Sequence, residues 1–352
     1  MSDRDPPADL LSSRTQRLHS DALRGYQSGP GKPKFRSHGT GSTPVEPVTG
    51  AHTGLIDRFV GIRHESSKLM GLWLALMNPP GHTRIRRLLR RAFTLSRMKA
   101  LQAYIRVQVD HHIDRAIERG TLDIIDGLAY PLMIDLNCNK ILGIPQQDWH
   151  HHFRPWTKSL SLLADLDITP LAYERGMLAI AGLAAYFRNW INECRAGYRP
   201  RDNLIDMLIA EEDRLSEEEL LANCIMMFTV GYSSTVNLIG IGMLSLLEHP
   251  MQLCLLTEDP SFIDMAIAEI LRYDSPVQGV SRTVFADVEL SNSTIHRGEK
   301  VIASSPPPIG DPARFPEPDT FDIRRQLNPS SPLAMASIHA SARIWPCWRQ
   351  KS

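Results

Sequence analysis

A long and almost wholly apolar run, Cys224 to Leu247, constrains the fold of this chain more than any other feature. A helix that is apolar on all sides is normally a core helix. Gly231 and three hydroxyl residues, Ser233, Ser234 and Thr235, interrupt the run. Such residues can bond to a carbonyl one turn back and loosen a helix, which makes room for a small ligand. Plain helix packing accounts for the same pattern, so both interpretations stay open from the run alone.

The rest of the chain carries mostly helical patterns. Apolar residues recur at spacings of three and four in segments 83–109 and 202–230, which predicts amphipathic helices. Ser216 and Glu219 form an S-x-x-E capping box before the apolar run. Short β-branched stretches broken by polar turns in 281–304 predict strands. The expected fold class is mainly α with a small β-rich part.

Composition changes along the chain. Residues 1–65 are rich in Gly, Pro, Ser and Thr, which predicts an irregular or poorly ordered N-terminal segment. We expect a helical domain over 66–328 and treat 329–352 as a separate tail.

Net charge, hydropathy and cysteine spacing argue against several classes of function. Lys+Arg and Asp+Glu both number 39, and this balance gives no support to nucleic-acid or anionic-membrane binding. We expect no apolar run of the roughly 18 residues that span a bilayer, and the first residues have no apolar leader region. The five cysteines are scattered and form no C-x-x-C pair, so we expect a reducing cytoplasm and no zinc or disulfide framework. The run 150–152 of three histidines is more typical of a solvated helix face than of a metal site.

Two further pairs have helical spacing. His82 and Arg86 share a helix face and suit a carboxylate group, although the neighbouring arginines equally favour a basic surface helix. Glu269 and Arg272 lie three apart. On a surface such a pair contributes only about 0.3–0.5 kcal/mol.

In their order and intervals, these segments resemble bacterial cytochrome P450s, the haem-thiolate monooxygenases. HTRIRRLLRRAFT is similar to the family's C helix, FTVGYSSTVNLIGIGMLSLLEHP to its I helix, and EILRYDSPVQGVSRTVFADVEL to its K helix and following strands. DPARFPEPDTFD is similar to the loop before the haem-binding segment. The resemblance covers 66–328 and implies the P450 fold, incomplete at both ends.

The resemblance also implies residue roles. His82, Arg86 and Arg282 would hold the haem propionates by charge-assisted hydrogen bonds. Glu269 and Arg272 would form a buried ion pair, in which losing one partner costs about 3–5 kcal/mol. Its third member is matched in position by Thr320, with Arg324 or Arg325 as a substitute. Gly231, Ser234 and Thr235 would form the oxygen-activating turn, where Ser233 replaces the usual acid.

The implied cofactor is a b-type haem, whose iron the protein would hold through a cysteine thiolate. Electrons would come from NAD(P)H through ferredoxin reductase and ferredoxin, and one oxygen atom of O2 would enter a small hydrophobic substrate. The alternatives are a catalytically inactive helical remnant, a hydrophobic-ligand-binding protein and an α-helical regulatory protein. Haem incorporation separates the first interpretation from these.

The family's cysteine loop, Phe-Gly-x-Gly-x-His-x-Cys-x-Gly, should begin just after Asn328. The chain instead continues NPSSPLAMASIHASARIWPCWRQKS, and Cys347 matches nothing in the loop. The codons permit another frame: shifted by one base from Pro332, they can spell FGxGIHxCLGAxLAxLEA. We therefore expect a frameshift near 329–331 that truncates the P450 sequence before its cysteine loop.

Overall fold

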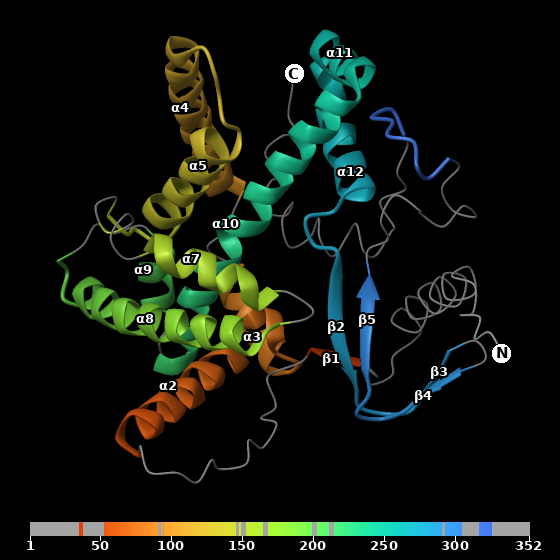
Figure 1. Ribbon diagram of the computed structural model, residues 1–352. Coiled ribbons are helices and arrows are strands. Elements are labelled where there is room, and N and C mark those ends of the chain that lie inside the picture. Colours follow the sequence, from red (N-terminus) through yellow and green to blue (C-terminus); the bar gives the residue numbers. More distant parts are fainter. Residues whose placement is uncertain are drawn as a thin grey trace. The chain divides into compact units, whose positions relative to one another are not determined.

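The computed structural model describes residues 35–37, 53–90, 93, 95–145, 148, 153–164, 168–198, 203–210, 215–290, 293–304 and 317–325. Contacts divide this part of the chain into two compact units (Figure 1). One unit holds the described residues from Thr53 to Glu248, and the other holds Phe35–Ser37 with those from His249 to Arg325. The second unit therefore joins a short N-terminal strand to the C-terminal part of the described chain.

The first unit is built from helices. They are α2 (Thr53–Gly71), α3 (Gly81–Leu89), α4 (Leu95–Arg119), α5 (Tyr130–Asp135), α7 (Arg154–Ser161), α8 (Pro170–Arg195), α9 (Leu204–Ile209) and α10 (Glu217–Glu248). Two π-helical segments, Ile125–Ala129 and Leu136–Ile141, flank α5. The prediction of a mainly helical protein is confirmed.

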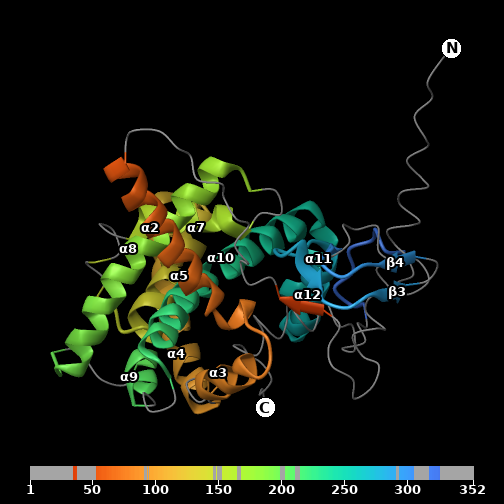
Figure 2. The same cartoon turned by 90° about the horizontal axis from the view of Figure 1, so that it is seen from below.

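The core of this unit lies around α8, which packs against α2, α7 and α10 (Figure 2). Phe153, Phe187 and Phe228 are fully buried there. The ring centroid of Phe228 lies 4.9 Å from that of Phe153 and 6.4 Å from that of Phe187. Aromatic rings at such separations stabilise a core beyond their buried area alone. The first part of α10, from Leu220 to Phe228, faces this core and is buried apart from Met227. That part of α10 is therefore a core helix.

The second half of α10 is more exposed, with Val230, Leu244 and Leu247 each about half accessible to solvent. Among the described helices, α10 is long and apolar enough to cross a bilayer by length and composition. The expectation that no apolar run reaches that length is therefore wrong, because Gly231 and the hydroxyl residues interrupt the run without making it polar. A core helix passes the same test, so this property by itself does not place α10 in a membrane.

The second unit combines helices with two small sheets. Its helices are α11 (Pro250–Glu258) and α12 (Ile263–Tyr273), and its strands are β1 (Phe35–Ser37), β2 (Gly279–Val284), β3 (Val288–Leu290), β4 (Ser293–Ile295) and β5 (Lys300–Ser304). The order β1-β2-β5 forms one antiparallel sheet, and β3 pairs with β4 in the other. The prediction of short strands in 281–304 is confirmed.

The N-terminal segment departs from its prediction. Helix α2 begins at Thr53, so the expectation of irregular structure up to residue 65 is wrong for its last part. Leu55, Ile56 and Phe59 have helical spacing, which the Gly- and Pro-rich residues before them obscured. Strand β1 was also missed. Phe35 pairs with Val284, and a stretch of three residues is too short to show a strand pattern.

Candidate functional site

Helix α3 carries the first pair of predicted site residues. Ile85, Leu88 and Leu89 bury one face of the helix, and this leaves Arg86 exposed and His82 half-buried. Burial lowers the pKa of His82, and the positive charge of Arg86 lowers it further. The structure therefore brings these two side chains close together, as their spacing predicted.

Arg282 lies in the other unit, on β2 between Val301 of β5 and Ser37 of β1. Its side chain is half-buried, and Nη1 donates to the carbonyl oxygen of Ser281 at 2.8 Å. A joint role of Arg282 with His82 and Arg86 stays a prediction.

The hydroxyl-bearing turn of α10 lies inside a continuous helix. Ser233, Ser234 and Thr235 are all half-buried, whereas Tyr232 is 5% exposed. Thr229, one turn earlier, donates from Oγ1 to the carbonyl oxygen of Ile225 at 2.8 Å. The hydroxyls therefore sit where the helix passes from its buried half to its more exposed half.

Two polar side chains hold this turn, and the sequence analysis missed both. Nδ2 of Asn137 donates to the carbonyl oxygens of Met227 at 3.3 Å and Phe228 at 2.9 Å. The hydroxyl of Tyr232 donates to the carbonyl oxygen of Thr157 on α7 at 2.8 Å. The stretch before Gly143 also contains Asp135, Asn139 and Lys140, so the sequence did not single out Asn137 or identify its partner some 90 residues away.

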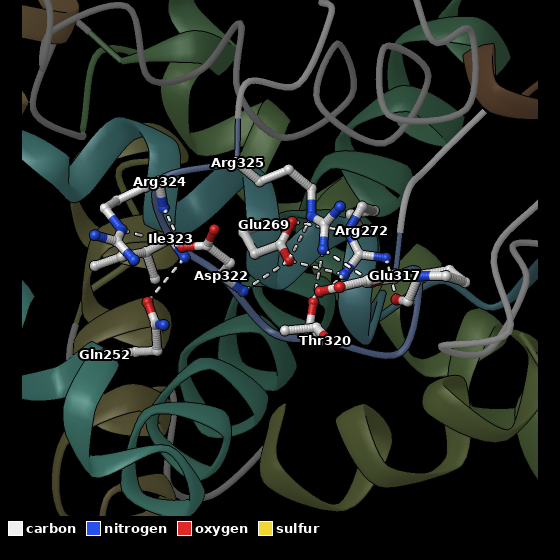
Figure 3. Close-up of polar contacts among 10 residues, drawn as sticks. Gln252, Glu269, Arg272, Glu317, Thr320, Asp322, Ile323, Arg324 and Arg325 are labelled. Carbon is white, nitrogen blue, oxygen red and sulfur yellow. Dashed lines mark hydrogen bonds and ion pairs between the residues drawn. The ribbon is translucent and has the colours of Figure 1, made fainter. Parts of the chain in front are cut away.

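The predicted pair Glu269–Arg272 lies on α12 and is buried (Figure 3). The Glu269 side chain is 0% exposed and that of Arg272 is 8% exposed. Nε of Arg272 donates to Oε2 of Glu269, and Nη2 donates to Oε1, both at 2.7 Å. This bidentate geometry is the strong form of an arginine–carboxylate pair. The pair predicted from the spacing is therefore buried and not on the surface.

Arg325 is the third member of the cluster. Its Nε lies 3.2 Å from Oε1 of Glu269, and its side chain is 13% exposed. Thr320, which matched by position, contributes only its carbonyl oxygen, which accepts from Arg325 Nη2 at 2.9 Å and Arg272 Nη2 at 3.1 Å. Arg324 turns to Asp322 instead, and its side chain is 62% exposed.

The cluster also anchors the segment 317–325 to its own unit. Oε1 of Glu269 accepts a hydrogen bond from the backbone N–H of Asp322 at 3.1 Å. Gln252 on α11 accepts another from the N–H of Ile323 at 3.1 Å. Phe321 packs its ring against those of His249 and Tyr273. A segment with little regular structure is thus held by one buried carboxylate and an aromatic contact.

The described cysteines do not fit the role of a haem ligand. Cys138, Cys194 and Cys224 are buried in the helical unit. Burial raises the pKa of Cys138, and it raises the pKa of Cys224 to about 12, so both stay thiols at neutral pH, whereas iron ligation needs a thiolate. Cys254 is exposed, and its hydrogen bond to Glu258 raises its pKa. Cys347 and the histidine run 150–152 lie outside the described residues.

The described residues thus fit a haem only in part. His82 and Arg86 offer paired donors for propionates, but no described side chain is placed as a thiolate. No cluster of three or more His, Cys, Asp or Glu side chains that could hold a metal ion forms among the residues the structure describes.

The comparisons with known proteins agree on one family. The family model for cytochrome P450 matches residues 59–340. A biotin biosynthesis cytochrome P450 of Bacillus subtilis (strain 168) is 33% identical over 274 residues, which is 77% of this chain and 67% of that protein. Vitamin D(3) 25-hydroxylase of Pseudonocardia autotrophica is 37% identical over 260 residues, 72% of this chain and 62% of that protein.

Solved structures extend the likeness to the fold. The crystal structure of P450BioI in complex with hexadec-9Z-enoic acid ligated acyl carrier protein has a TM-score of 0.73 at 27% identity and covers 96% of this chain and 91% of that one. CalO2 has a TM-score of 0.67 at 26% identity, with 97% and 90% covered. This chain spans two thirds or less of the length of the two curated relatives named above. The fold, the buried Glu269–Arg272–Arg325 cluster and the match over most of its length place this chain in the cytochrome P450 family.

Proposed function

We propose that this protein is a P450-type monooxygenase that inserts one oxygen atom of O2 into a small hydrophobic substrate. The observation that carries the proposal is the family match, which runs from α2 through α10 and α12 to residue 340. The relatives' names support the reaction class, because a vitamin D(3) hydroxylase and a 6-deoxyerythronolide B hydroxylase are among them. These substrates, like the fatty acyl chain in the P450BioI complex, are largely hydrophobic. Their diversity supports a class of substrate rather than one compound.

The chain's own residues would share the work as follows. His82, Arg86 and Arg282 would bind the haem propionates, because charge-assisted hydrogen bonds suit carboxylates. When bound, the haem supplies the activation of O2. Ser234 and Thr235 would hold ordered water and relay protons through their hydroxyls, one turn after Gly231. Ser233 cannot act as the usual acid, so we expect a slower relay than in relatives that carry one.

P450 enzymes generally receive electrons from redox partners, and we propose a ferredoxin and its reductase, with NAD(P)H as the ultimate source. The basic surface at the end of α3 supports an acidic partner, since Arg87 and the adjoining Arg90 are exposed while the apolar face is buried. Complementary charge raises the rate of association, and high salt reduces this gain because it screens the attraction. Electron transfer that falls steeply between low and high ionic strength is the expected outcome.

We further propose a cytoplasmic location. The four described cysteines form no disulfide with one another, which supports a reducing compartment. Fractionation of cells tests this, because a chain in which α10 crosses a bilayer would sediment with the membranes.

The iron ligand decides whether the chain as written is active. We propose that it binds no haem in thiolate form, since residues 329–352 do not spell the cysteine loop, and that the chain with the shifted frame restored does. The test is the carbon monoxide difference spectrum of both proteins after reduction. We expect a thiolate-type band only from the restored chain. A thiolate band from the chain as written would overturn the ligand proposal, and haem-free protein from both would favour a catalytically inactive remnant or a hydrophobic-ligand-binding protein.

A further inference from the structure

The amide of Asn137 is buried against a single turn of α10. The residue is 1% exposed and lies in the π-helical segment Leu136–Ile141, a geometry that is rare and occurs mostly at functional sites. Nδ2 donates to the carbonyl oxygens of both Met227 and Phe228. A flipped amide would set Oδ1 against these two oxygens, so the contacts determine which way the amide faces.

Packing alone does not account for an asparagine here. Oδ1 of Asn137 is buried and makes no hydrogen bond to the described part of the protein. An apolar side chain of similar size would fill the space without leaving a buried acceptor unsatisfied, which is costly. Asn137 therefore does more than fill volume, because its amide donates two hydrogen bonds to α10.

Gly231 occupies the complementary position. A Cβ built on this residue would lie 2.8 Å from both Nδ2 and Oδ1 of Asn137, closer than a carbon atom can approach. Glycine in the middle of a helix is less favourable than alanine, so its presence here needs a local cause. The amide of Asn137 supplies one, because it fills the volume that a side chain would take.

The same turn is also held from α7. Tyr232 is 5% exposed and donates from its hydroxyl to the carbonyl oxygen of Thr157 at 2.8 Å. Ser233 and Ser234 follow directly in the chain. Their place along and around the helix is thus set by one contact before Gly231 and one after it.

We propose that Asn137 is a positioning residue, which fixes the turn of α10 that carries Ser233 and Ser234, and that Gly231 is a glycine in order to admit its amide. The value of that position for proton delivery rests on the proposed function. The contact itself does not, so it can be tested on the full chain without haem, O2 or substrate.

The first experiment is a double-mutant cycle of N137A and G231A, measured by urea unfolding. In the natural background G231A should lower the midpoint, because the new methyl group meets the amide. In the N137A background the same change should leave the midpoint unchanged or raise it, because the space is free and alanine favours the helix. An equal loss in both backgrounds would overturn the proposal.

The second experiment locates the effect by amide hydrogen exchange under native conditions. N137L keeps most of the volume but removes both donors, so exchange of the amides in 231–235 should become about tenfold faster, the effect of roughly one net hydrogen bond. The matched control is N223L. Asn223 is equally buried and also donates to two carbonyl oxygens, of Leu72 and Glu219. Its loss should speed exchange near the start of α10 and leave 231–235 unchanged. Unchanged exchange at 231–235 in N137L would refute the positioning role.

A third variant separates hydrogen bonding from shape. N137D keeps the shape, but its carboxyl donates a hydrogen bond only when protonated. Measured against the natural chain at each pH, protection of 231–235 in N137D should recover as the pH falls, while N137L should show no recovery. The same pH response in both variants would leave only a space-filling role and would overturn the proposal. Failure of the carbon monoxide test would touch none of these three outcomes.

Discussion

Glu269 shows how much one buried side chain can organise. Its carboxylate accepts from two arginines and one backbone N–H, and it is closed off from solvent. A buried carboxylate without partners would be strongly destabilising, whereas here its charge is balanced and its lone pairs are used. The cost of desolvation is thereby offset, and segment 317–325 is tied to α12.

The cluster predicts an unequal effect of two neighbouring arginines. R325A should lower the free energy of unfolding by about 1.5–3 kcal/mol, because it removes a charged hydrogen bond to a buried carboxylate. R324A, the matched control, should change it by no more than about 0.5 kcal/mol, since that side chain is exposed. Urea unfolding of both variants is the measurement. Equal losses would contradict the assignment of Arg325 as the third member.

R272A should lower the free energy of unfolding by more than R325A or R324A does. Arg272 supplies both prongs of the pair, so its removal leaves Glu269 with one cation and should cost about 3–5 kcal/mol. The same unfolding assay measures this loss, and a cost below that of R325A would be inconsistent with the geometry.

His82 makes the stability of the protein depend on pH. Burial and then Arg86 lower its pKa from 6.5 in the folded chain, so the unfolded chain takes up the proton first as the pH falls. The contribution of His82 to stability is therefore constant above pH 6.5 and decreases below it. NMR titration of labelled histidines should show R86Q raising the pKa of His82 part of the way to 6.5, because burial remains. R87Q, which changes an exposed neighbour, is the control and should leave the titration unchanged.

At the scale of an element, the start of α10 is joined to three other parts of its unit. Ser216 and Glu219 form the predicted capping box, with each backbone N–H donating to the other side chain at 3.0–3.1 Å. Glu219 also pairs with Arg84 of α3, and Asn223 bonds to Leu72 and Leu74. Burial alone would raise the pKa of Glu219, but the bonds from Arg84 and Ser216 outweigh it and lower the pKa. Its stabilising contribution is thus present above the pKa of the unfolded carboxyl and lost as the pH falls through the folded value.

Substitutions at this helix end should rank by these contacts. S216A should lower the free energy of unfolding by about 0.5–2 kcal/mol through loss of the cap. E219A should cost more, because it removes the cap's second half and the pair with Arg84 together. K68A should cost about 1 kcal/mol or less, since Lys68 and its partner Glu218 are both more than half exposed. A ranking with K68A above S216A in thermal or urea unfolding would contradict this picture.

At the scale of the whole molecule, the central question is the tail. The P450 fold is present from α2 to the segment 317–325, while residues 329–352 carry no cysteine loop. We predict that the coding DNA, shifted by one base near codons 329–331, spells Phe-Gly-x-Gly-x-His-x-Cys-x-Gly. Sequencing the gene decides this directly. A shifted frame without that cysteine would end the frameshift hypothesis and leave a natural departure from the family.

Features whose partners lie within about one helical turn or one hairpin could be predicted from the amino-acid sequence. The helical repeats, the strands of 281–304, the Ser216–Glu219 box and the Glu269–Arg272 pair follow from local spacing, because backbone geometry sets which near neighbours meet. The apolar spacing at the start of α2 is also a local signal. It was missed because the Gly- and Pro-rich composition of the residues before it predicted irregular structure.

Contacts between residues far apart in the chain emerged only from the folded structure. It selected Arg325 over Thr320 and Arg324 as the partner of Glu269, 56 residues earlier, and it placed Asn137 against α10 across 91 residues. It also paired Phe35 with Val284. Such contacts depend on how whole elements pack, and one stretch of sequence carries no signal for them. The apolar run from Cys224 to Leu247 therefore predicts a helix that carries hydroxyl residues, but it does not predict the Asn137 amide that holds their turn in place.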